Sequence, residues 1–172
     1  WLPMVGSFKE KKFTSITQGQ INLDDLDEKN QDKKKDDKNE KEKKDKEYVD
    51  LVAQLKVVLG DQVKDIRLSS KLTDSPVCLV ADEGDMDIAM EQLMAQRDTN
   101  YKGAPRILEI NGDHSLIKNM KSLLSKKENN DLVSDAGTLL FEQARLMEGK
   151  MPADPAQFSK IMNQFLLKAI PN

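Results

Sequence analysis

The sequence predicts an α+β domain made of a small three-stranded sheet with packed helices. Three observations predict it. Short β-rich runs occur three times between positions 62 and 111, and apolar residues recur at helical spacing around them. The predicted order is a helix, two strands, a helix, a strand and three further helices, which is typical of α+β proteins. With 172 residues, the chain can hold one ordinary domain with a tail, or two small domains.

The composition narrows the class of function. Hydrophobic residues make up 38% of the chain and charged residues 33%, so we expect part of the chain to lie outside a core. A net charge of -3 argues against a general nucleic-acid binder, because such proteins usually carry a basic excess. No apolar run approaches the roughly 20 residues that a membrane helix needs, and we expect no signal peptide. Because the chain does not begin with Met, we expect it to be a fragment of a longer protein.

The region before the predicted domain has two parts. Residues 1–22 contain too many apolar groups for a disordered tail and too few to bury one another, so we interpret them as the end of a preceding domain. Residues 24–47 hold 11 acids, 9 bases and one apolar residue, Leu26. Disorder is the default for such a run, although acid–lysine pairs four residues apart favour a solvated helix. We interpret residues 23–47 as a charged linker that is helical toward its end.

A helix is predicted over about residues 48–59, and Gly60 can cap its end. Its apolar face consists of Tyr48, Leu51, Val52, Leu55, Val58 and Leu59.

Three strands are predicted next. In residues 62–69, the apolar Ile66 and Leu68 share one face of the strand. Residues 76–81 are apolar throughout, so this strand could be buried on both faces. Residues 105–111 follow a turn signal and form the third strand.

A row of methionines lies on the helix predicted between the second and third strands, at residues 84–97. A stripe of this kind is usually part of a core. Met is also polarizable and has many rotamers, so it suits a surface that must accept partners of many shapes. The residues alone leave both interpretations open. The stripe consists of Met86, Met90, Leu93 and Met94.

Three helices are predicted at the end of the chain, over about 113–125, 131–147 and 154–170. Gly149 stops the second, and Asp154, followed by Pro, is a plausible N-cap for the third. The last two helices are expected to form an antiparallel hairpin, which either covers the sheet or pairs with its copy in a twofold four-helix bundle. The residues that would form this dimer interface are Leu139, Leu140, Met147, Phe158, Ile161, Met162, Phe165 and Leu166.

Two residues are candidates for catalysis, and neither is supported by a motif. His114 could in principle act as a general base, but a local hydrogen-bonding or capping role is the better interpretation. Cys78 lies in an apolar run and is interpreted as a small buried hydrophobe. A single cysteine excludes an internal disulfide and a multi-cysteine metal site. We therefore expect no catalytic, cofactor-binding or metal site in this fragment.

Several stretches resemble the C-terminal domain of the heat-shock protein 90 chaperones, and in particular their bacterial branch. They are "LGDQVKDIRLSSKLTDSPVCLVADEGDMDIAMEQLM", "RILEINGDHSLIKNM" and "FSKIMNQFLL". The match is ordered and nearly gapless from about Val58 to Asn172. Residues 1–22 are similar to the end of that family's middle domain, which makes residues 48–172 the C-terminal dimerisation domain.

The resemblance implies an ATP-driven homodimeric chaperone of three domains, which uses ATP and magnesium. The family's nucleotide site lies in the N-terminal domain and its catalytic arginine in the middle domain. This sequence contains neither, so we expect no ATPase activity from the fragment itself.

The resemblance also implies roles for the two apolar stripes. In the family, the last two helices form the dimer bundle, and an amphipathic helix in the cleft between protomers contacts non-native client proteins. Met86, Met90, Leu93 and Met94 match that helix. Trp1 is similar to an aromatic residue that contributes to the same surface.

Two departures from the family pattern affect these expectations. The chain has Gly112 where the family often has Pro in an Asn-Pro-Asp-His turn, which loosens the turn without abolishing the helix start. It ends in "KAIPN", without the acidic Met-Glu-Glu-Val-Asp tail or a retention signal. We therefore expect no cochaperones that read the tail, and a location in the bacterial cytoplasm. The alternative is a monomeric protein-interaction module with a charged spacer and no chaperone role.

Overall fold

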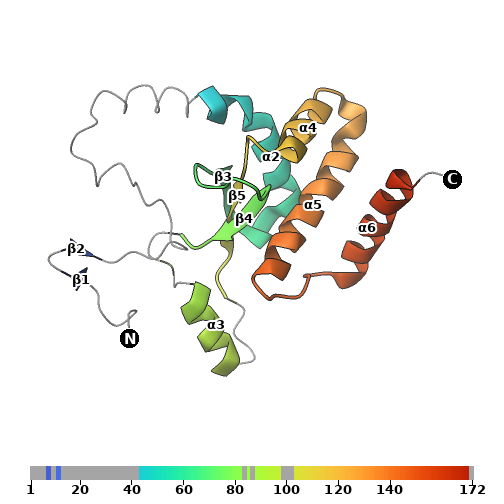
Figure 1. Cartoon of the computed structure of the whole chain (residues 1–172). Helices are drawn as coiled ribbons and strands as arrows, with labels where there is room; N and C mark the ends of the chain where they lie inside the picture. The colour runs from blue at the N-terminus through green and yellow to red at the C-terminus, as the bar shows by residue number, and fades with distance from the viewer. Residues whose placement is uncertain are drawn as a thin grey trace.

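The computed structural model describes residues 7–8, 11–12, 43–82, 85, 88–97 and 103–170 (Figure 1). Near the N-terminus, the two-residue strands β1 (Ser7–Phe8) and β2 (Lys11–Lys12) pair in an antiparallel manner. Trp1, Met86 and residues 23–42 of the predicted linker lie outside the described residues. Residues 43–47, at the end of the predicted linker, are helical.

The main sheet has three strands in the order β3-β5-β4. The edge strand β3 (Val63–Leu68) runs parallel to the central strand β5 (Arg106–Ile110), and β4 (Val77–Val80) runs antiparallel to it. The α+β class and the small three-stranded sheet are therefore confirmed.

One expectation about the sheet was wrong. The apolar strand β4 is an edge strand, in which Val77 and Leu79 are buried while Cys78 and Val80 are only half-buried. The strand that is buried along its whole length is β5, although it contains Arg106 and a glutamate. Their charges are accommodated because each is paired with an opposite charge, as described below.

The helices pack mainly on one face of this sheet. In Figure 1, α2 (Val49–Leu59), α4 (Ser115–Leu124) and α5 (Asn130–Met147) lie beside one another, and α6 (Pro155–Ala169) is outermost and packs on α5. Short 3-10 turns follow α2 and α4, at Gly60–Gln62 (η3) and Lys127–Asn129 (η4). The core lies between the sheet and α2, α4 and α5. Its fully buried side chains include Leu51, Leu55, Leu59, Leu108, Ile110, Ile117, Met120 and Val133.

Local signals mark the helix ends as the sequence predicted. The His114 ring accepts a hydrogen bond from the Leu116 amide at 3.1 Å and so caps α4. The Asp154 carboxylate accepts from the Gln157 amide at 2.9 Å and caps α6. Gly149, with φ 77°, follows the end of α5 in the left-handed conformation that glycine adopts readily. The capping role predicted for His114 is confirmed.

Candidate protein-binding surfaces

The methionine helix α3 (Ile88–Arg97) presents apolar side chains to solvent. Met90, Leu93 and Met94 are 48%, 46% and 41% exposed. In Figure 1 the helix lies apart from the layer formed by α2, α4 and α5. These three residues therefore form a surface stripe, and the alternative that they belong to the core does not describe this fold.

A buried ion pair attaches this helix to the sheet. Glu91, in the first turn of α3, is 4% exposed, and its carboxylate lies 2.5 Å from the guanidinium of Arg106 at the start of β5. It also accepts a hydrogen bond from the Ala104 amide at 3.1 Å. Sequence reasoning missed this pair, because its two members are 15 positions apart and each looks like an ordinary surface charge.

The predicted dimer residues divide into an inner and an outer set. Ile161 of α6 and Leu140 of α5 are buried within the protomer, and Leu139, Phe158 and Phe165 are half-buried. The outer set faces solvent and extends further than the sequence analysis proposed, because Met151, Leu167 and Ile170 were missed. This exposed set, the terminal apolar surface, consists of Met147, Met151, Met162, Leu166, Leu167 and Ile170.

Polar contacts hold the connection between α5 and α6. The buried carboxylate of Glu142 accepts a hydrogen bond from the Ala153 amide at 3.1 Å and lies 3.2 Å from the Arg145 guanidinium. Arg145 also donates to the Met151 carbonyl oxygen at 3.0 Å. The connection therefore has a defined conformation, which fixes the start of α6 relative to α5.

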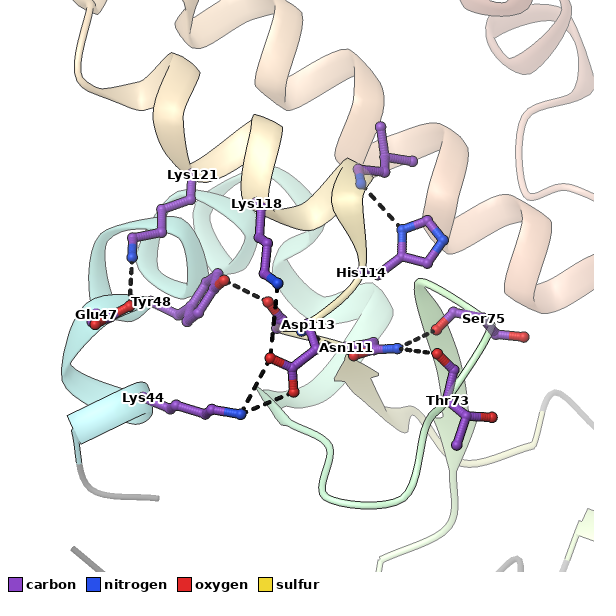
Figure 2. A network of polar contacts seen from close by, with 12 residues as sticks. Lys44, Glu47, Tyr48, Thr73, Ser75, Asn111, Asp113, His114, Lys118 and Lys121 are labelled. Atoms are coloured by element: carbon purple, nitrogen blue, oxygen red, sulfur yellow. Dashed lines mark hydrogen bonds and ion pairs between the residues drawn. The ribbon is translucent and has the colours of Figure 1, made fainter. Parts of the chain in front are cut away.

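A polar network joins the end of the charged segment to the turn before α4 (Figure 2). The buried Tyr48 hydroxyl donates to the Gly112 carbonyl oxygen at 2.6 Å. Lys44 lies 2.9 Å from the Asp113 carboxylate, and Lys121 lies 2.7 Å from a carboxylate oxygen of Glu47. The last residues of the charged segment are thus held against the turn before α4.

The electrostatics of this network follow from its ion pairs. The hydrogen bond from Lys44 lowers the pKa of Asp113, and the hydrogen bond from Lys121 lowers the pKa of Glu47. Burial raises the pKa of Tyr48. At neutral pH the carboxylates are therefore charged and the tyrosine is a hydrogen-bond donor, as the network requires.

The same turn is held from its other side by Asn111. Its side-chain amide donates to the carbonyl oxygens of Thr73 and Ser75, both at 3.2 Å, and its oxygen accepts from the Asp113 amide at 3.0 Å (Figure 2). Gly112 follows in a crowded position, where an added Cβ would lie 3.1 Å from the Tyr48 ring. The turn is therefore well determined with Gly in place of Pro.

The surroundings of His114 and Cys78 do not favour catalysis. The His114 ring nitrogen that faces α4 is occupied by the cap. Burial raises the pKa of the Cys78 thiol to about 11, so it is protonated and a weak nucleophile at neutral pH. Within the described ranges, no group of three or more His, Cys, Asp or Glu side chains could hold a metal ion. Among the helices described, none is long and apolar enough to cross a membrane.

Comparison with known families identifies the class of protein. A family model described as Hsp90 protein matches residues 2–171. The chain belongs to the Hsp90 protein family, and the resemblance inferred from its residues is confirmed at that level.

Individual relatives are bacterial chaperones. The chain is 41% identical over 172 residues to the chaperone protein HtpG of Roseobacter denitrificans, a match that covers 99% of this chain and 27% of that protein. It is 36% identical to the chaperone protein HtpG of Paramagnetospirillum magneticum, with 99% of this chain and 27% of the relative covered. The chain is 34% identical to the chaperone protein HtpG of Streptomyces coelicolor, a match that covers 94% of this chain and 24% of that protein. The chain spans about a quarter of the length of these relatives.

Proposed function

We propose that this chain is the C-terminal dimerisation and client-contacting domain of a bacterial ATP-dependent chaperone of the Hsp90 family. In this proposal residues 1–22 end the middle domain, residues 23–47 are a charged linker and residues 48–172 form the dimerisation domain. The ATP and magnesium of the whole protein bind elsewhere in the parent chain, which works in the cytoplasm.

The observation that carries the proposal is the terminal apolar surface. Six large apolar side chains of one helical hairpin are exposed together, and apolar side chains gathered on one exposed element often mark an interaction site. The surface lies on a helical hairpin at the end of the domain, where a twofold axis could bring two hairpins together as a four-helix bundle. Each large apolar side chain would contribute about 1.5–3 kcal/mol on full burial, before the cost of association of about 4–15 kcal/mol is subtracted.

The first test is the solution mass of the chain by sedimentation equilibrium, with and without Met162→Glu and Leu166→Glu. Both side chains are exposed and lie one turn apart on α6. We expect the unchanged chain to be a dimer and the double variant to be a monomer, because the new carboxylates of both protomers would be buried at the bundle axis without partners.

The matched control is Asn163→Glu with Gln164→Glu, which adds the same charge to exposed positions of the same helix. We expect this variant to remain a dimer with an unchanged thermal melt. A chain that is monomeric before any substitution would overturn the dimer proposal and favour the alternative, a monomeric interaction module.

The second test concerns the client surface on α3. Met90 and Met94 lie on α3 with their side chains already in solvent, and Met86 precedes that helix in the sequence. The variant changes all three to Ser, which removes their apolar groups. We therefore expect the thermal melt to change little, while binding of a reduced, carboxymethylated lactalbumin that cannot fold weakens about tenfold or more. Unchanged binding would remove α3 from the client surface.

A further inference from the structure

A buried carboxylate lies among the exposed side chains that the structure describes on α3. Among the residues of α3 whose side chains are described, Glu91 is the one that is buried, while Met90, Leu93, Met94 and their neighbours Gln96 and Arg97 are exposed. The described apolar side chains therefore do not hold the helix against the sheet. Among the described side chains of α3, it is the Glu91 carboxylate that contacts the start of β5.

The surroundings of this carboxylate are specific. Arg106 is itself 3% exposed and belongs to the central strand, so the pair connects α3 to a strand that is hydrogen-bonded on both sides. Gly103, with φ 69°, brings the chain so close that a Cβ there would lie 3.2 Å from a Glu91 carboxylate oxygen. The Ala104 amide then donates to the other oxygen. The carboxylate is therefore held from two directions, by a side chain and by the backbone.

Because a helix is regular, the contact between Glu91 and Arg106 also fixes how α3 is rotated about its own axis. Successive residues of an α-helix are rotated by roughly 100°, so fixing Glu91 toward Arg106 fixes the direction of Met90 beside it. Met90, Leu93 and Met94 share a face of the helix whose centre lies roughly 100° from Glu91. A buried ion pair adds little net stability, since desolvation offsets the attraction, but it permits few alternative arrangements.

We propose that the Glu91–Arg106 pair is a latch that sets the orientation of α3 and so presents the methionine stripe to client proteins. Both are positioning residues, because neither belongs to the exposed stripe. This inference rests on the proposed function of α3 in client binding. Without the latch the helix would sample many orientations, and affinity would fall in proportion to the fraction of time spent in the presenting one.

The experiment measures orientation and binding separately in the 172-residue chain. A nitroxide label is attached at Gln96→Cys, an exposed position of α3, in a Cys78→Ser background. The latch is removed by Glu91→Leu with Arg106→Leu, since replacing both partners of a buried ion pair by apolar residues usually preserves the fold. We expect a nearly unchanged thermal melt, a label that becomes mobile in its resonance spectrum, and about tenfold weaker binding of carboxymethylated lactalbumin.

The matched control removes another ion pair of the same sheet. Arg67 lies 2.9 Å from Glu109, between β3 and β5, and changing both to Leu should leave the label immobile and the affinity unchanged. If the double Leu variant at the latch does not fold, Glu91→Gln replaces it with the same readouts, because the amide removes the charge and keeps the size.

The outcomes distinguish the latch from the proposed function. If the label stays immobile in the variant that lacks the ion pair, the latch proposal is overturned. It is also overturned if the label becomes mobile but the affinity for carboxymethylated lactalbumin does not change. Failure of the client proposal is recognised by the methionine-to-serine variant, which would then bind as the unchanged chain does. The label spectrum needs no client and therefore still reports whether the pair holds the helix.

Discussion

Tyr48 joins the end of the charged segment to the core of the domain. Its ring is buried in the core cluster, its hydroxyl donates to the Gly112 carbonyl oxygen, and the Lys121 ammonium lies 4.7 Å from the ring centroid. One residue thus connects the start of α2 with the turn before α4, which are 64 positions apart in the sequence.

We expect Tyr48→Phe to destabilise the domain by about 1–3 kcal/mol, because the buried Gly112 carbonyl loses its donor. The measurement is the urea concentration at the midpoint of unfolding. A lower midpoint with the same dependence of the free energy of unfolding on urea reports the loss of stability. Lys44→Ala serves as the comparison, since it removes an exposed ion pair to Asp113 and should cost only about 0–1 kcal/mol. If both variants lost the same free energy of unfolding, the buried hydrogen bond of Tyr48 would stabilise the domain no more than the exposed ion pair does.

Contacts close in the sequence could be predicted, and contacts between distant residues could not. The caps at His114 and Asp154 depend on residues two or three positions away, so the sequence pattern contains them. Gly137 is different: a Cβ there would clash with the Leu55 side chain, because α2 and α5 approach closely at this point. Nothing in the residues around Gly137 indicates which helix lies against it.

At the level of elements, the types and approximate bounds of the helices and strands were predictable, but the position of each strand in the sheet was not. An apolar run such as β4 predicts a strand that could be buried on both faces. The central strand β5 instead contains two charged residues, and both are buried. Arg106 is paired with Glu91. Glu109 is paired with Arg67 and also accepts a hydrogen bond from the Ser69 hydroxyl. Which strand is central goes together with such pairs between distant residues, and the spacing of apolar residues in the sequence does not predict them.

The attachment of α6 makes a prediction about Glu142. In Glu142→Ala, the Ala153 amide loses its acceptor, so we expect the start of α6 to open more easily by about 1–3 kcal/mol. Hydrogen exchange should then become about 5- to 150-fold faster for the α6 amides while it changes little in β5.

The matched control is Gln143→Ala, an exposed neighbour on the same helix, which should leave exchange as it is. Equally faster exchange in β5 would mean that Glu142 stabilises the whole domain and does not specifically fix α6.

At the level of the whole molecule, the two apolar surfaces lie on separate parts of the domain. Figure 1 shows α3 and α6 on different sides of the sheet and its covering helices. The sequence contained both stripes but not their exposure, because an apolar stripe has the same periodicity whether it meets the protein's own core or a partner. A surface that binds a second copy should couple folding to concentration, whereas a surface for transient clients should not.

We therefore expect the melting temperature of the chain to rise with its concentration. If folded dimers convert to unfolded monomers, an unfolding enthalpy of about 0.7 kcal/mol per ordered residue gives a rise of about 3 °C for each tenfold increase. Scanning calorimetry over a hundredfold range of concentration measures this slope. The Met162→Glu and Leu166→Glu variant should lose the dependence, while the methionine-to-serine variant of α3 should keep it. If the melting temperature of the unchanged chain did not depend on concentration, the terminal apolar surface would not stabilise the fold by binding a second copy.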